Sequence, residues 1–337
     1  MSWNYALPLE QGDTSGGSIA KSFGVLWKSL RALSNPPMLR KTRMMAGLLS
    51  RMAICIPTQR KIAGLFKDAV LNETAQVFPR LPYKHLTCRY LLRDLPIPTC
   101  AECFFHHYDR LRTVLPIWLL RRTLLDKTTL FELEENGVRL AITMSHSMPF
   151  DTEGELSLNL QMGDKIIYIM GFSIVPGRIV QSSAKDVFLI TRLQGTKGVH
   201  KELSQATKSF GDVGPIALLF AALQGIGNIF GIDTAACISG TMQISYDAQY
   251  ASSFQRSYDD FFLQRGIQPN SGGFFITPLP LEEKSMDDIK KGHKIRTREK
   301  RALRREVQQA CVDFFVSNGL TDTHAAESST LAGSVTH

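Results

Sequence analysis

Val187-Phe-Leu-Ile-Thr191 is the apolar run that decides the fold of this chain, because two similar runs follow it. The second run is Ala235-Ala-Cys-Ile238 and the third is Gly273-Phe-Phe-Ile276, and helical patterns separate the three. Short apolar runs that alternate with helical segments are typical of strands in a partly parallel sheet. The sequence therefore predicts an α/β (α+β) core whose C-terminal half contains β–α–β units.

Four more strands are predicted upstream of these runs, at residues 130–134, 138–144, 156–161 and 165–175. The dipeptide Asn136-Gly137 lies between the first two, and Gly163-Asp164 lies between the last two. Such pairs favour the tight turns of β-hairpins. We therefore expect an antiparallel meander that leads into the β–α–β units.

Helical periodicity dominates the first third of the chain. The predicted helices cover residues 18–33, 38–54, 58–72 and 99–125, whereas the four prolines of residues 77–98 indicate irregular structure. These patterns divide the chain into four parts. We expect a flexible arm (1–17), a helical basic region packed on the core (18–127), the α/β domain (128–316) and a disordered tail (317–337).

The segment Val213–Ile232 contains no charged residue and is nominally long enough to span a bilayer. Pro215, Gln224, Asn228 and four glycines interrupt its apolar character, which makes membrane insertion unfavourable. We therefore predict a buried helix of the α/β core here rather than a membrane span.

The chain of 337 residues carries a net charge of +8, which favours acidic partners. No acidic residue lies between Asp13 and Asp68, where ten lysines and arginines occur. The Lys21–Lys67 region could contact an anionic membrane, although solvated cations on packed helices are the favoured interpretation. The absence of a secretory signal at the N-terminus and the sparse cysteines predict a cytoplasmic protein, with contact at the inner membrane as the alternative.

A second basic cluster, Lys290–Arg305, holds nine lysines and arginines and one acidic residue, Glu299. No aromatic side chains are interleaved to stack on bases, so a nucleic-acid partner is not expected. The pattern favours a solvated helix face or a patch that contacts an acidic surface of the same protein.

The segment Arg192–Gly198, at the end of the first quoted run, is the strongest candidate for a ligand site. A glycine-rich turn between a strand and a helix exposes backbone N–H groups that can bind a phosphate. The segment loosely resembles the pyrophosphate-binding turn of GNAT-type acyltransferases, [Q/R]-x-x-G-x-[G/A], although Lys197 replaces the final small residue. The resemblance implies a coenzyme A thioester, or another phosphate-bearing ligand, held by Arg192, Gln194, Gly195, Lys197 and Gly198. Turn geometry alone would also explain the glycines.

The order of the predicted elements is also similar to that of a GNAT-like acyltransferase core. In such enzymes a tyrosine near the helix after the next strand often protonates the departing thiolate, and Tyr246 and Tyr258 are the candidates here. Both could instead be ordinary packed aromatic residues. The sequence does not identify a general base, and Glu153 and Glu155, before or on a strand of the meander, are possible candidates.

Two other patterns carry less weight. Cys100-x-x-Cys103 with His106-His107 has the spacing of zinc ligands on one helix, but no fourth ligand is evident. Packed thiols and a packed histidine are therefore favoured, and no metal is predicted. Ser145-His146-Ser147 near Asp151 lacks the context of a catalytic triad.

Several of these features together look like the VirK/YbjX family of Gram-negative bacterial proteins, over about residues 60–315. The matching segments are Pro82-Tyr83, His107-Tyr108, Ile190-Thr-Arg-Leu-Gln-Gly195, Pro215–Ile232, Tyr258-Asp-Asp-Phe-Phe262, the strand from Phe274 to Leu279, and Lys290–Arg305. Two segments depart from the family pattern: Ser209–Pro215 lacks the usual arginine, and Met242-Gln-Ile-Ser-Tyr246 replaces a His-Val-Tyr-like stretch.

The resemblance implies a role in envelope maintenance or virulence, and the molecular activity of the family is open. Two hypotheses follow from the sequence. The first is a VirK/YbjX-like protein that acts as an acyl-CoA-dependent transferase. The second is a non-enzymatic basic protein that binds an anionic membrane surface or nucleic acid. The sequence does not decide whether the protein is an enzyme.

Overall fold

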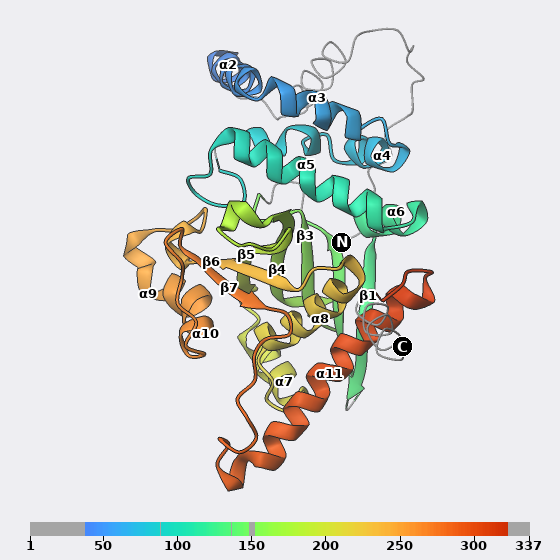
Figure 1. Ribbon diagram of the computed structural model, residues 1–337, viewed down its shortest axis with the longest axis vertical. Helices are drawn as coiled ribbons and strands as arrows, with labels where there is room; N and C mark the ends of the chain where they lie inside the picture. The colour runs from blue at the N-terminus through green and yellow to red at the C-terminus, as the bar shows by residue number, and fades with distance from the viewer. Residues whose placement is uncertain (1–37, 88, 136, 148–151, 323–337) are drawn as a thin grey trace, which may run out of the picture.

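A computed structural model describes residues 38–322 of the chain, apart from 88, 136 and 148–151 (Figure 1). The predicted arm at 1–17, the predicted helix at 18–33 and most of the predicted tail lie outside these residues. Figure 1 shows helices α2 to α6 as a layer at one end of the sheet, with α7, α8 and α11 beside its other part. The buried apolar side chains of the helices and the sheet form one continuous core.

The helical layer is divided more finely than the sequence predicted. Its elements are α2 (Met38–Ile54), α3 (Ile56–Leu65), α4 (Ala69–Val77), the 3₁₀ helix η1 (Leu81–Leu86), α5 (Ile97–Val114) and α6 (Ile117–Leu125).

Two predicted helices, 58–72 and 99–125, are each broken in two. Asp68 caps α4, because its carboxylate accepts hydrogen bonds from the backbone N–H groups of Val70 and Leu71 at 2.9 and 3.2 Å. Leu115 is extended, with ψ of 132°, because Pro116 disfavours helical geometry in the residue before it. An N-cap and a proline thus override continuous apolar periodicity.

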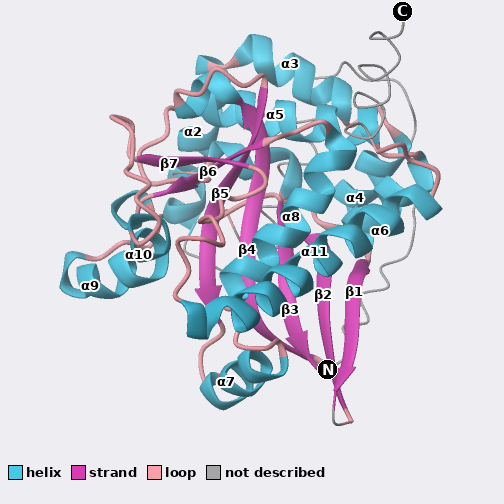
Figure 2. Ribbon diagram, turned by 60° about the horizontal axis from the view of Figure 1, so that its bottom comes forward, coloured by secondary structure: helices cyan, strands magenta, loops and turns pink. Residues whose placement is uncertain are grey.

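One seven-stranded sheet forms the centre of the protein, with its strands in sequence order (Figure 2). The strands are β1 (Lys127–Glu135), β2 (Val138–His146), β3 (Leu156–Met162), β4 (Lys165–Pro176), β5 (Asp186–Gly195), β6 (Thr234–Ile238) and β7 (Phe274–Pro278). Neighbouring strands are antiparallel except for the parallel pair β5 and β6. The predicted meander and the mixed α/β class are confirmed, with a mostly antiparallel sheet.

The connection from β5 to β6 contains α7 (His200–Ser209) and α8 (Pro215–Phe230). The predicted buried helix at 213–232 is confirmed as α8, whose residues are mostly buried. Among the described residues, no helix is both long and apolar enough to cross a membrane. Two predictions need correction. Strand β7 pairs antiparallel with β6, so only the connection from β5 to β6 is a parallel β–α–β unit. Arg192 to Gly195 continue β5, so the turn before α7 is only residues 196–199.

Helix α11 (Lys294–Ser317) crosses α8 closely, next to Gly225. A Cβ atom at Gly225 would lie 2.5 Å from the Gln308 carbonyl oxygen and 2.7 Å from the Cys311 Cβ. Only glycine therefore allows this contact.

The basic cluster at the start of α11 contacts acidic groups of the same chain. Arg296 is ion-paired with Asp212, and Lys300 donates to the Asp212 carbonyl oxygen at 2.8 Å. Arg301 and Arg304 both bind Glu283, at 2.9 and 2.6 Å. These contacts match the favoured interpretation of the cluster as a patch on an acidic surface of the same protein.

The remaining helical pieces lie between the strands or before α11. They are η2 (Gly177–Val180), η3 (Gly240–Met242), η4 (Ala248–Tyr250), α9 (Ala251–Phe254), the π-helix η5 (Gln255–Asp259), α10 (Asp260–Leu263) and η6 (Lys291–His293). The run α9–η5–α10 lies in the connection from β6 to β7 and contains Tyr258.

Candidate functional site

The C-terminal half of β5 continues beyond its parallel neighbour β6. The pairing joins Phe188, Leu189 and Ile190 to residues 235–237, whereas β5 runs on to Gly195. After β6 ends at Ile238, the chain turns into η3. Residues 191–195 therefore have β4 on one edge, and no described strand pairs with their other edge. Such an edge offers backbone groups to a ligand or to a side chain.

Tyr258 reaches this edge of β5 from the π-helix η5. Its phenol is hydrogen-bonded to the backbone of Leu193, and the side chain is almost completely buried. Burial raises the pKa of Tyr258 far above its ordinary value, and the nearby Glu153 carboxylate raises it further. The Leu193 backbone and the Arg192 guanidinium lower this pKa only in part. The phenol therefore keeps its proton at neutral pH.

Glu153 lies near enough to the Tyr258 phenol to raise its pKa, and it faces Arg192 of β5. Its Oε2 atom is 3.6 Å from the Nε atom of Arg192, and its Oε1 atom accepts a hydrogen bond from the Gln243 side-chain amide. The other end of Gln243 accepts hydrogen bonds from the Ser245 backbone N–H at 2.5 Å and from its hydroxyl at 2.6 Å. The carboxylate is thus oriented by Arg192 and by a glutamine that is itself fixed.

Tyr246, the other predicted tyrosine, does not reach β5. Its ring packs on Phe254 at 5.2 Å, and Phe254 in turn packs on Tyr258 at 6.4 Å. The Arg93 guanidinium lies 5.9 Å from the centre of the Tyr246 ring. Tyr246 is therefore one aromatic ring removed from the group formed by Tyr258, Arg192 and Glu153, which we call the β5 edge site.

The predicted anion-binding residues lie along the same strand and the turn that follows it. Gln194 is exposed at the end of β5, Gly195 is its last residue, and Lys197 and Gly198 are exposed in the turn. Gly198 has φ of +84°, which favours glycine. No side chain caps the N-terminus of α7, so its first N–H groups can bind an anion.

A shallow depression of about 410 Å³ lies on α7 immediately after this turn. It is lined by His200, Lys201, Ser204, Gln205 and Lys208. Its hydroxyl, amide, imidazole and ammonium groups suit a phosphate-bearing ligand. The turn and the depression together give a polar, basic path that leads away from the β5 edge site.

A tight segment connects the β5 edge site to a second cluster of polar groups. Gly154, between Glu153 and Glu155, has φ of +125°, and a Cβ atom there would lie 2.7 Å from the Phe172 backbone nitrogen. The Glu155 backbone N–H donates to the Phe172 carbonyl oxygen and to the Ser173 hydroxyl, both at 3.1 Å. Glu153 and Glu155 are thus held in fixed and different environments.

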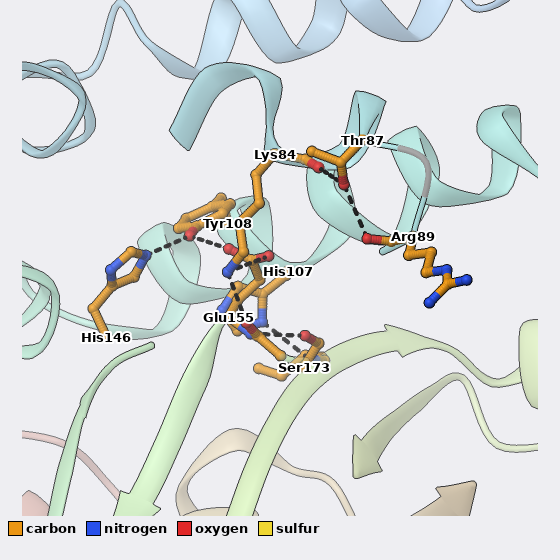
Figure 3. A network of polar contacts seen from close by, with 10 residues as sticks. Lys84, Thr87, Arg89, His107, Tyr108, His146, Glu155 and Ser173 are labelled. Carbon is orange, nitrogen blue, oxygen red and sulfur yellow. Dashed lines mark hydrogen bonds and ion pairs between the residues drawn. The ribbon is translucent and has the colours of Figure 1, made fainter. Parts of the chain in front are cut away.

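Glu155 lies at the centre of what we call the buried network (Figure 3). Its Oε1 atom is 3.2 Å from the Lys84 ammonium, which also donates to the Gly154 carbonyl oxygen at 2.8 Å. The Tyr108 hydroxyl donates to Glu155 Oε2 at 2.5 Å and lies 3.1 Å from His146 Nε2. Side chains of η1, α5 and β2 therefore converge on one carboxylate that is completely buried.

Burial keeps the histidines of this region neutral. Burial, together with a smaller effect of the Lys84 ammonium, lowers the pKa of His146 to about 3. It also lowers the pKa of His107 well below its ordinary value, and the ring accepts a hydrogen bond from the Ile174 backbone N–H at 3.0 Å. Burial raises the pKa of Tyr108. The buried network thus holds one ion pair among neutral polar groups.

Sequence reasoning missed the buried network. Glu155 was a candidate base, but it lies in the interior and is paired with Lys84, so only Glu153 reaches the β5 edge site. The one local signal was Tyr83-Lys84-His85, a polar run inside the irregular proline-rich segment. Its partners are distant in sequence, and their polar character alone does not identify them.

Cys100, Cys103 and His107 are packed in the core, as the favoured interpretation predicts, whereas His106 is partly exposed and lies 2.8 Å from Asp186 Oδ1. Cys100 and Cys103 are buried, and the Cys100 thiol donates to the Leu95 carbonyl oxygen at 3.4 Å. Burial raises the pKa of Cys100 to about 12. Within residues 38–322 and outside the gaps, no group of three or more metal-ligating side chains occurs. His146 belongs to the buried network, and Asp151 lies outside the described residues.

Comparison with known proteins gives a family but no activity. A family model described as a protein of unknown function (DUF535) matches residues 37–311. No curated protein and no solved structure matches the chain. The matched region includes the sheet, the β5 edge site and the buried network. The chain therefore belongs to the DUF535 family, which corresponds to VirK/YbjX.

Proposed function

We propose that this protein is an acyltransferase that uses an acyl-coenzyme A, or a related phosphate-bearing thioester, as its donor. One observation carries the proposal: the protonated Tyr258 phenol meets the β5 backbone where β5 leaves β6, beside Glu153 and Arg192. Acyl transfer can use a proton donor for the leaving group and a carboxylate as the base. The edge of β5 would bind the acyl donor beside these two groups.

The strand edge and the turn would bind the donor. Amide groups in the pantetheine arm of coenzyme A can pair with the β5 backbone, as an added strand would. The phosphates would then lie at the N-terminus of α7, near Lys197, where backbone N–H groups and the helix dipole favour an anion. The meander followed by one parallel β–α–β pair supports the analogy with GNAT-type enzymes, and fold analogy alone does not establish activity.

The chemistry divides between two side chains. Glu153 takes the proton from an amine or hydroxyl acceptor as that group attacks the thioester carbonyl. The tetrahedral intermediate collapses, the C–S bond breaks, and Tyr258 gives its proton to the departing thiolate. The raised pKa keeps the Tyr258 phenol protonated before the step, and the same shift makes it a weaker proton donor, so transfer depends on the negative charge that develops on sulfur as the C–S bond breaks.

The wider role belongs to the same proposal. A place in envelope maintenance rests on the VirK/YbjX resemblance, and acyl groups are a chemistry that envelope components share. The second hypothesis, a basic protein that binds a membrane surface or nucleic acid, gains no support from α11. Several of its cations are already paired with Asp212 and Glu283 of the same chain.

Calorimetric titration of the full chain with acetyl-CoA and with a long-chain acyl-CoA tests the proposal. We expect saturable binding that Lys197→Ala weakens about tenfold, roughly 1.4 kcal/mol, through loss of a phosphate contact. Lys185→Ala is the matched control, because Lys185 is an exposed lysine just before the other end of β5. That variant should bind as the native chain does.

The outcomes separate the two hypotheses. Binding to neither donor, or equal weakening by Lys197→Ala and Lys185→Ala, would remove the support for the acyltransferase. Binding of anionic vesicles or nucleic acid that disappears as salt rises to physiological strength would instead support the non-enzymatic hypothesis.

A further inference from the structure

A cavity of about 460 Å³ lies between α8 and α11, and the proposed acyl transfer does not use it. Its volume is in the range of about 300–1,000 Å³ that is usual for small-molecule sites. Helix α8 forms one wall and the basic part of α11 forms another. The segment after β7, from Pro280 to Glu283, closes a third side.

The wall formed by α8 is apolar. Ala217 and Ala221 lie one helical turn apart, and their small side chains leave room for a ligand. Phe220 is buried and stacks on Phe261 of α10, with ring centres 5.6 Å apart and planes 10° from parallel. Leu281 adds apolar surface from the opposite segment. Such a surface favours an apolar ligand over water.

The wall formed by α11 is basic. Arg301 Nε lies 2.9 Å from Glu283 Oε2, and Arg304 Nη2 lies 2.6 Å from Glu283 Oε1. Two guanidinium groups therefore share one carboxylate. Arg305 also lines the cavity and is exposed, and among the described residues we find no ion pair for it. The lining of the cavity thus carries three cations and two exposed carboxylates, Glu282 and Glu283.

A fourth cation lies close to this wall. The Arg265 guanidinium covers the Phe261 ring at 3.7 Å, behind the ring of Phe220. Burial lowers the pKa of Arg265, and the positive charge of Arg304 lowers it further. A cluster of positive charges on one part of the surface attracts an anion.

We propose that this cavity binds a single-chain amphipathic anion, an alkyl chain that carries a phosphate or carboxylate head group. The chain would lie along Ala217, Phe220 and Ala221. The head group would bind Arg305 and compete with Glu283 for Arg301 and Arg304. Guanidinium groups bind both head groups through paired hydrogen bonds, so the chemistry is common to fatty acids and alkyl phosphates.

Isothermal titration of the full chain with four probes tests the proposal: decyl phosphate, decanoate, 1-decanol and inorganic phosphate. Decyl phosphate or decanoate should bind saturably at one site, and the stronger of the two identifies the head group. Decanol and inorganic phosphate, each with half of the required chemistry, should bind at least about tenfold more weakly. Shortening the chain by two carbons should weaken binding about tenfold.

Two variants test the location. Arg305→Gln should weaken binding of the better anion about tenfold. Arg298→Gln is the matched control, because Arg298 is an exposed arginine two turns earlier in α11 that does not line the cavity. Ala217→Phe should abolish binding by filling the apolar wall. Circular dichroism of each variant confirms that it is folded.

A third variant should act in the opposite direction. Glu283→Gln releases Arg301 and Arg304, so it should tighten binding of the anion several-fold. No saturable binding of either anion, equal weakening by Arg305→Gln and Arg298→Gln, or weaker binding by Glu283→Gln would overturn the proposal. Lys197→Ala should leave this binding unchanged, which separates the cavity from the acyl-CoA site.

Discussion

The β5 edge site and the buried network are joined through Glu153-Gly154-Glu155, but their carboxylates differ in burial and in hydrogen bonding. Glu155 is completely buried and bound by Lys84 and Tyr108. Glu153 and Arg192 keep 16% and 24% of their side-chain surface exposed and lie 3.6 Å apart. The first carboxylate is fully engaged inside the protein, whereas the second can still meet a substrate. We infer that the network positions the segment and the edge site performs the chemistry.

The largest expected effect comes from breaking the ion pair of the buried network. Lys84→Met leaves the Glu155 carboxylate buried without its cation, and we expect a loss of about 3–5 kcal/mol in the free energy of unfolding. Denaturant titration measures it. Arg121→Ala breaks the exposed pair with Glu73 and should leave the free energy of unfolding nearly unchanged, because solvent screens the two charges. Equal losses in the two variants would mean that the network adds no special stability.

The edge site should respond in rate rather than in stability. Tyr258→Phe removes the proton donor but keeps the ring, so kcat for release of the coenzyme A thiol should fall about 10²–10⁴-fold. Acyl-CoA affinity and the unfolding midpoint should change little. Tyr246→Phe is the matched control and should keep its rate, because Tyr246 does not reach β5. The assignment fails if the two variants lose activity equally.

Lowering the pH should destabilise the folded protein through its buried histidines. The pKa values of His146 and His85 in the folded protein are about 3, below the ordinary value near 6.5, because burial disfavours the charged ring. Their stabilising contribution is complete above pH 6.5 and is lost as the pH falls toward 3. The expected slope is about 1.4 kcal/mol per pH unit for each histidine. Unfolding followed from pH 7 to 4 checks it, and His146→Gln should reduce the slope.

Gly154→Ala tests the connection between the two regions. An alanine at φ of +125° is strained, and its Cβ would collide with the Phe172 backbone, so we expect a loss of about 1–3 kcal/mol in stability. Acyl-CoA binding should weaken as well, because Glu153 moves with the segment. Gly292→Ala is the control, since no atom lies within 4 Å of the added Cβ. A loss of stability with unchanged binding would separate the two regions.

The strands could be predicted from the sequence because apolar runs and turn dipeptides are local signals. The edge site could be predicted in part. Arg192, Gln194, Gly195, Lys197 and Gly198 do lie along β5 and the turn after it, and Tyr258 reaches β5. The extension of β5 through Arg192 to Gly195 could not be predicted, because a glycine at this place in a sequence usually indicates a turn. In the structure Gly195 still pairs with Tyr168 of β4.

The buried network could not be predicted, because its members are polar residues at large sequence separations. Lys84 lies in an irregular segment, Tyr108 in a long helix, and Glu155 just before a strand. Only tertiary packing brings them together. In the same way, helix breaks at Asp68 and Pro116 depend on capping and on a proline that override apolar periodicity.

Hydrogen–deuterium exchange with and without a long-chain acyl-CoA tests the location of the proposed site most directly. The account predicts that the ligand protects the backbone N–H groups of residues 191–199 and of the first turn of α7. The amides around Glu155 are already protected by burial and should change little. Protection confined to α8 and α11, or no protection at β5, would contradict the assignment of acyl transfer to the β5 edge site.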